Sequence, residues 1–147
     1  MRKPTLRTDA GALLEACPGV LARVAARRIT RVLDRALAPT GLGAAQLALL
    51  AQIAVAKDDR MAALAQRAGL DPSTLSRNLR RLEAEGLVEI ASVEADLRRR
   101  AVWLTESGAR RLEAALPLWR AAQAEVARHV EAAPARRLAA QAEALET

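Results

Sequence analysis

The sequence predicts a mainly helical fold with one small β-hairpin, and three observations lead to this class. Alanine and leucine are abundant, while the aromatic residues are limited to two tryptophans, a composition that favours helices. Apolar residues recur at three- and four-residue steps through most of the chain. The pattern changes after Gly86, where Leu87–Ala91 alternates between apolar and polar residues as a strand does. One hairpin among helices is therefore expected.

Length, charge and cysteine content limit the classes of protein to which the chain can belong. The chain has 147 residues, the size of one ordinary domain, and a net charge of +6, which suggests an anionic partner without setting specificity. Cys17 is the only cysteine, so no intrachain disulfide forms, as in a reducing cytoplasm. We find no long apolar run, no secretory signal and no Cys/His cluster of metal-ligand spacing. A cytoplasmic protein without a membrane partner, metal or cofactor is expected.

Residues 1–43 are predicted to form an N-terminal arm and a dimerisation helix. Residues 1–10 are basic and are expected to be a flexible arm. A helix is expected from about Pro18 to Ala38, because apolar and arginine residues interleave there, and the breakers at Pro39–Gly43 end it.

Residues 44–104 are predicted to form a helix-turn-helix followed by a hairpin. Ala44–Ala56 is almost continuously apolar and should be a deeply buried helix. A short helix at Met61–Arg67 and a turn containing Gly69 lead into the next helix. Helix, glycine-containing turn and helix in this order are typical of a helix-turn-helix.

The second helix of this pair, expected over Pro72–Glu85, has two unlike faces. Asp71 is a good N-cap, and Leu75, Leu79 and Leu82 form one apolar stripe. Acids appear only in its last turn, which favours docking in a DNA major groove over a solvated surface helix. The polar residues on its other faces are Ser73, Thr74, Ser76, Arg77, Asn78, Arg80 and Arg81.

A hairpin directly after such a helix is interpreted as a wing. The first strand is Leu87–Ala91, residues 92–100 are polar, and the returning strand is Ala101–Leu104. The predicted tip is basic, because it contains Arg98, Arg99 and Arg100. These arginines suit the minor groove or DNA phosphates.

Residues 105–147 are predicted to be C-terminal dimerisation helices. Thr105 is a suitable N-cap for a long helix to about Val130, with Pro117 inside it as a candidate kink. Ala133-Pro134 is expected to break this helix before a last one at about Ala135–Leu145. The terminal helices carry more apolar surface than a small winged domain covers, so two chains are expected to pack together.

The chain resembles the MarR family of bacterial winged helix-turn-helix transcriptional regulators over nearly its whole length. The segments that carry the resemblance are Leu37-Ala38-Pro39-Thr40-Gly41-Leu42 with Gln46, Leu64-Ala65-Gln66-Arg67-Ala68-Gly69-Leu70, Ser73-Thr74-Leu75-Ser76-Arg77-Asn78-Leu79-Arg80-Arg81-Leu82-Glu83 with Gly86-Leu87-Val88, and Asp96-Leu97-Arg98-Arg99-Arg100-Ala101-Val102-Trp103-Leu104-Thr105 with Gly108.

The resemblance implies a homodimer that binds a pseudo-palindromic operator in double-stranded DNA. The two recognition helices would enter successive major grooves about 34 Å apart. The polar residues of Pro72–Glu85 named above would contact bases or phosphates. Asp96 matches the family acid that orients the wing arginine, here Arg98, with Arg99 beside it. The expected function is a regulator, taken as a repressor, that an unidentified small-molecule effector releases.

Two features are candidates for sensing. Cys17 precedes Pro18 and resembles the cysteine of hydroperoxide-responsive relatives, but those relatives hold the thiolate with tyrosines and this chain has none. A small packing residue is therefore favoured over an oxidant sensor. Arg23, Arg27 and Arg31 lie four residues apart on one helix face. They suit a carboxylate-bearing effector, although solvated charge or ion pairing between subunits is favoured.

Two other classes of function are weighed against DNA binding. A winged-helix module that binds protein instead of DNA is disfavoured, because such modules tend to lack arginines on this helix and wing. An enzyme is disfavoured because we find no Ser/His/Asp set, His-Glu metal motif or phosphate loop.

Overall fold

The structure, a computed structural model, describes residues 5–93 and 96–146, with the side chains of 93, 96–99 and 146 left out of the description. The helices and strands, in chain order, are α1 (Leu6–Ala16), α2 (Pro18–Leu37), the 3-10 helix η1 (Ala38–Thr40), α3 (Ala44–Val55), α4 (Met61–Ala68), α5 (Pro72–Ala84), β1 (Val88–Val93), β2 (Asp96–Leu104), α6 (Glu106–Ala127), α7 (Ala132–Glu143) and the 3-10 helix η2 (Ala144–Glu146).

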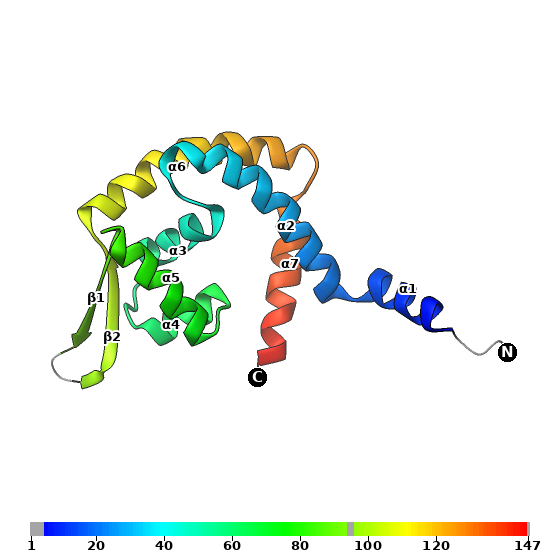
Figure 1. Cartoon of the computed structure of the whole chain (residues 1–147), viewed down its shortest axis with the longest axis horizontal. Helices are drawn as coiled ribbons and strands as arrows, with labels where there is room; N and C mark the ends of the chain where they lie inside the picture. Colours follow the sequence, from blue (N-terminus) through cyan, green and yellow to red (C-terminus); the bar gives the residue numbers. More distant parts are fainter. Residues whose placement is uncertain (1–4, 94–95, 147) are drawn as a thin grey trace.

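The helices and strands form two groups. The first contains α3, α4, α5 and the hairpin, and the second contains the long helices α2 and α6 together with α1 and α7 (Figure 1). Contacts of α3 with α2 and α6 join the two groups. Figure 1 shows α2 and α6 side by side as an arch, with α3, α4 and α5 below one end of it and the hairpin beyond them. α1 extends away at the other end, and α7 descends from the arch (Figure 1). The mainly helical class with one two-stranded sheet is confirmed.

Leucine is the main residue type of the core. The predicted stripe of α5 is confirmed, because Leu75, Leu79 and Leu82 are each at most 1% exposed. The prediction that α3 is deeply buried is also confirmed, since four of its apolar residues lie in the core. Among the described residues, the largest fully buried side chains are Leu37, Leu50, Leu64, Leu75, Leu79, Leu82 and Leu87.

The hairpin is longer than predicted. β1 and β2 pair antiparallel, with Val88 opposite Leu104 and Ser92 opposite Arg100. Residues 98–100 therefore lie within strand β2, and their prediction as a tip was wrong. The prediction failed because a strand segment composed mostly of charged residues lacks the apolar alternation by which strands are recognised.

The loop between α3 and α4 pairs with the hairpin. The amide of Val102 donates to the carbonyl of Asp59 at 3.0 Å, and Arg60 forms an isolated β-bridge with Ala101. The sequence did not predict this pairing. The pairing gives β2 a second neighbour and fixes the base of the hairpin to the helix-turn-helix.

Gly108 lies where α5, the hairpin and α6 meet. Thr105 caps α6 as predicted, because its Oγ1 accepts the Gly108 amide at 3.0 Å and donates to the Gly86 carbonyl at 2.6 Å. A Cβ atom on Gly108 would stand 1.9 Å from the Leu87 carbonyl oxygen. Only glycine allows α6 to begin this close to the end of α5.

The prediction of a flexible arm over residues 1–10 was wrong from Leu6 onward. α1 begins there, and its N-cap Thr5 accepts the amide of Thr8 at 3.3 Å. The helix was missed because it buries none of its residues and so lacks a clear apolar stripe. The basic residues Arg2 and Lys3 of the predicted arm lie outside the described residues.

The C-terminal boundaries also differ from the prediction. α6 ends at Ala127 and α7 begins at Ala132, so the break falls at 128–131 and not at Ala133-Pro134. Pro134 is tolerated in the first turn of α7, because an amide there has no intrahelical acceptor. Pro117 lies inside α6, whose ribbon changes direction along its length (Figure 1).

In the part of the chain that the structure describes, no single helix is long and apolar enough to cross a membrane. One pair of helical segments, Pro18–Thr40 and Ala44–Val55, would together be long and apolar enough, but by length and composition only, and the pair is bent by 76°.

Candidate nucleic-acid interface

The N-terminus of α5 is organised by Asp71. Its carboxylate accepts the backbone amides of Ser73 at 3.1 Å and Thr74 at 3.0 Å, and both hydroxyls donate to it. These hydrogen bonds hold the pKa of Asp71 well below its usual range, and the two bonds from the hydroxyls have the largest effect. The hydroxyl protons of Ser73 and Thr74 are thereby used within the protein, so their oxygens are left as acceptors for a partner.

The outer face of α5 is basic. At 3.6 residues per turn, Ser73, Arg77 and Arg80 lie opposite the leucine stripe, and all three are exposed. Arg77 donates to the Thr74 hydroxyl at 3.3 Å. Within the described residues, neither Arg77 nor Arg80 has an ion pair with an acid. This face therefore presents uncompensated positive charge on a rigid helix.

The two flanks of α5 carry its other polar residues. Ser76 on one flank, together with Arg80 at the edge of the outer face, lines a cleft of about 250 Å³ toward the hairpin, where Ser92 and Arg100 form the opposite side. The sequence predicted Arg100 as a basic wing residue but not its place in this cleft. Arg100 lies two residues before the buried Val102 along β2, so both side chains are on the face toward the core.

On the opposite flank, Asn78 and Arg81 line a cavity of about 230 Å³ that α2 and the start of α3 complete. Arg81 also pairs with Glu85 at 3.5 Å. The predicted contacts on α5 thus divide into an outer face and two flanks, and the structure does not bring all of them to one surface.

The wing candidates Asp96, Arg98 and Arg99 have their backbone in β2, while their side chains lie outside the description. The orientation of Arg98 by Asp96 stays a prediction.

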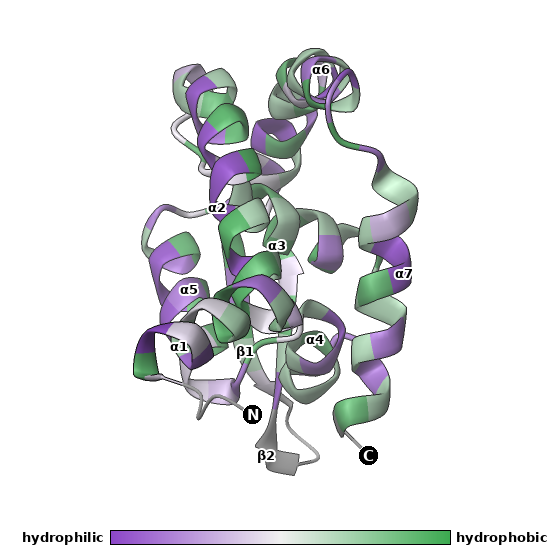
Figure 2. Ribbon diagram, turned by 90° about the vertical axis from the view of Figure 1, so that its right-hand side faces the viewer, coloured by the Kyte–Doolittle hydropathy of each residue, from purple (hydrophilic) through white to green (hydrophobic). Residues whose placement is uncertain are grey.

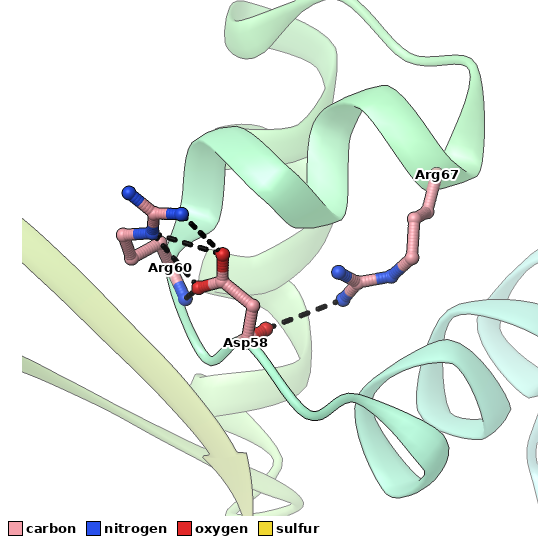
Figure 3. A network of polar contacts seen from close by, with 3 residues as sticks. All are labelled: Asp58, Arg60 and Arg67. Carbon is pink, nitrogen blue, oxygen red and sulfur yellow. Dashed lines mark hydrogen bonds and ion pairs between the residues drawn. The ribbon is translucent and has the colours of Figure 1, made fainter.

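A polar network that the sequence did not predict fixes the start of α4. Figure 3 shows the Asp58 carboxylate against the Arg60 guanidinium, whose Nε donates to it at 2.9 Å and 3.0 Å. Arg67 Nη2 donates to the Asp58 carbonyl at 3.5 Å. The hydrogen bonds that Arg60 donates to Asp58, and then the negative charge of that carboxylate, raise the pKa of Arg60. The network holds the loop that pairs with β2, and so supports the position of the wing.

The sensing candidates lie on or before α2. Cys17 is half-buried and occupies the N-cap position of α2. Arg23, Arg27 and Arg31 are exposed on that helix. The cavity that α2 helps to form is lined by Thr30 and Asp34. The oxidant-sensing and arginine-pocket hypotheses stay predictions.

The Asp71 cap predicts a stability that depends on pH. Because the folded-state pKa of Asp71 is below its ordinary value of 3.8, the stabilisation is complete above that value and is lost as the pH falls through the folded-state pKa. We expect Asp71→Ala to lower the melting temperature clearly at about pH 7, and the difference from wild type to shrink at about pH 2. Asp71→Asn, which keeps a cap acceptor without the charge, is the control. An equal difference at both pH values would contradict the role of the charge.

The fold and this surface define a winged helix-turn-helix protein of the DNA-binding class. The MarR family model matches residues 40–99. The chain is similar to the Mycobacterium tuberculosis transcriptional regulator MosR, solved in complex with DNA, with 38% identity over 88% of this chain and 96% of that chain and a TM-score of 0.80. The chain belongs to the MarR family of transcriptional regulators, which are DNA-binding regulators and not enzymes.

Two structures of MarR from Escherichia coli extend the comparison. A mutant MarR complexed with operator DNA is 27% identical over 90% of this chain and 96% of that chain, with a TM-score of 0.74. The apo form of wild-type MarR is 26% identical over 87% of this chain and 96% of that chain, with a TM-score of 0.66. The comparison with curated proteins found no match.

Proposed function

We propose that this protein is a homodimeric repressor that binds a pseudo-palindromic operator and is released by a small molecule. The observation that carries the proposal is the outer face of α5, where Arg77 and Arg80 stand exposed opposite a fully buried leucine stripe. A helix whose apolar face packs on the core and whose opposite, polar face is exposed suits insertion into a major groove. The higher TM-score against the MarR–operator complex than against apo MarR supports a conformation suited to DNA.

The terminal helices support a dimer. α1 and α7 bury no residues within one chain, although both contain apolar residues, which Figure 2 colours green. The partner that matches both helices is a second copy of the chain, because a symmetric dimer covers the same patch on each subunit. We therefore assign residues 1–43 and 105–147 to dimerisation, and 44–104 to DNA binding. The exposed apolar residues of the terminal segments are Leu6, Leu13, Leu14, Leu21, Val24, Val130, Leu138 and Leu145.

A dimer would read DNA with two copies of α5. Their separation must match one helical turn of the duplex, about 34 Å, so a shift of either helix disrupts several phosphate contacts together. A molecule that changes this separation releases the protein. A dimer that covers an operator obstructs transcription by occupancy, so repression requires no further surface.

The proposal is tested by selecting bound fragments from the source genome and footprinting one of them. We expect two protected half-sites related by a dyad, with centres about 10 base pairs apart, and a complex mass of two chains per duplex. The same fragment with one half-site scrambled is the control and should bind far more weakly. A single protected half-site with one bound chain would contradict the paired arrangement.

A further inference from the structure

Polar contacts join the DNA-binding elements to the long helices at two places. The first is the start of α6, where the Thr105 hydroxyl donates to the Gly86 carbonyl and the Thr105 amide donates to the Leu87 carbonyl at 3.1 Å. The second is the connection between α2 and α3, residues 38–43, which runs from the arch down to α3 (Figure 1). Two separate attachments fix an orientation, whereas one attachment alone acts as a pivot.

The connection between α2 and α3 is a tight turn closed by its own hydrogen bonds. Gly41 has a φ of +73°, in the left-handed region. The Thr40 hydroxyl donates to the Leu37 carbonyl at 2.7 Å and accepts the Leu42 amide at 3.2 Å. These bonds fix the shape of the turn, but they all lie within it. A link to α6 must come from another residue.

Arg111 supplies this link. Its Nη1 atom donates to the Thr40 carbonyl at 3.0 Å, although the two residues are 71 positions apart. A Cβ atom on Gly41 would lie 3.4 Å from the same nitrogen, so the half-buried guanidinium stands against the glycine. Within residues 5–93 and 96–146, Arg111 has no ion pair with an acid and no second hydrogen-bond partner. Its guanidinium is therefore committed to the turn.

Asp34 holds the other side of the same connection. Its Oδ1 atom accepts the Ala44 amide at 2.7 Å, so α2 caps the start of α3, where the N-cap Gly43 has no side chain to do so. The connection is thus tied to both helices of the arch, by an acid of α2 and a base of α6. Apolar packing between these elements is non-directional, whereas hydrogen bonds depend on angle and distance.

We propose that Arg111 is a positioning residue for operator binding. Its hydrogen bond to Thr40 fixes the orientation of α3, α4, α5 and the hairpin relative to the arch. The consequence for DNA rests on the proposed function, because in a homodimer the orientation of each half sets the position of its α5 along the duplex. Arg111 thereby limits the spacing of half-sites that the protein accepts, and it acts without touching a base or a phosphate.

The first test compares an operator with one whose half-sites are moved apart by one base pair. The insertion shifts a half-site by about 3.4 Å and rotates it by about 35°. Wild type should bind the altered operator at least about tenfold more weakly than the original. Arg111→Ala should reduce this ratio to about threefold or less, weaken binding to the original operator several-fold, and leave affinity for random duplex unchanged.

Two variants separate position from charge. Arg110→Ala removes the same charge one residue away, where Arg110 is exposed and pairs with Glu106 at 3.2 Å. It should keep the wild-type spacing ratio. Arg111→Lys keeps the charge and a donor, and should restore most of the ratio. An unchanged ratio in Arg111→Ala, an equal fall in Arg110→Ala, or weaker binding of Arg111→Ala to random duplex would overturn the proposal.

The second test measures the orientation without DNA. Spin labels are placed on α5 and α6 at Ala84→Cys and Arg120→Cys, two exposed positions, in a Cys17→Ser chain diluted with unlabelled protein. The distance distribution between the labels should be narrow, and Arg111→Ala should broaden it while Arg110→Ala leaves it unchanged. If Arg111→Ala does not fold, the shorter, neutral Arg111→Gln takes its place in both tests.

The two tests distinguish failure of the proposal from failure of the proposed function. The label distance lies within one chain, so it requires neither a dimer nor an operator. A protein that binds no paired half-sites would contradict the proposed function and leave the distance measurement valid. An equally narrow distribution in Arg111→Ala would overturn the role of Arg111, whether or not the protein binds DNA.

Discussion

Replacing Gly108 with alanine is expected to lower the free energy of unfolding by about 1–3 kcal/mol or more, the range of overpacked sites. The added Cβ would stand 1.9 Å from the carbonyl oxygen of Leu87 and 2.9 Å from its carbonyl carbon. Both atoms are backbone, so no side-chain rotation relieves the contact. α6 or the end of α5 must shift, and the Thr105 hydrogen bonds that join them are disturbed.

Gly11→Ala is the matched control, because a Cβ there meets nothing within 4 Å and Gly11 is inside helix α1. It should leave stability unchanged or raise it by up to about 1 kcal/mol, since alanine is the better helix former. Urea unfolding of both variants provides the comparison. A Gly108→Ala protein as stable as wild type would show that α6 does not approach Leu87 this closely.

Replacing Arg77 with alanine is expected to weaken operator binding by about 1–3 kcal/mol and to relax sequence preference at one position in each half-site. Arg77 lies opposite the leucine stripe and is exposed, so its loss should leave the fold intact. Its bond to the Thr74 hydroxyl limits the freedom of the guanidinium before DNA arrives. Fluorescence anisotropy with the selected operator measures the change.

Arg120→Ala on α6 separates a specific contact from net charge, because it removes the same charge from an exposed position on another helix. It should change operator affinity far less than Arg77→Ala. Equal losses in both variants would mean that only overall charge matters and that α5 is not the recognition helix.

The parts of the fold that local chemistry determines were predicted from the sequence. The Asp71 cap, the leucine stripe of α5 and the end of that helix at Gly86, which has a φ of +72°, each depend on residues within a few positions. α1 and most of β2 were not predicted. α1 buries nothing in one chain, and the polar part of β2 pairs with β1 without apolar alternation.

The candidate site was predicted only where one helix supplies it. The outer face of α5 follows from helical periodicity alone, which is why Arg77 and Arg80 were found. The cleft with Arg100, the Asp58–Arg60 pair beside β2 and the cavity lined by Asn78 and Arg81 each join segments that are distant in the sequence. No local sequence pattern predicts contacts between distant segments, so these features could be identified only from the structure.

The central claim is that this chain binds duplex DNA through the basic face of α5. It is tested most directly by the salt dependence of binding to a random duplex. Arg77 and Arg80 from two subunits should together neutralise at least four phosphates, which gives a slope of about −3.6 or steeper for log affinity against log salt concentration. A slope near zero, or no binding at low salt, would contradict the account.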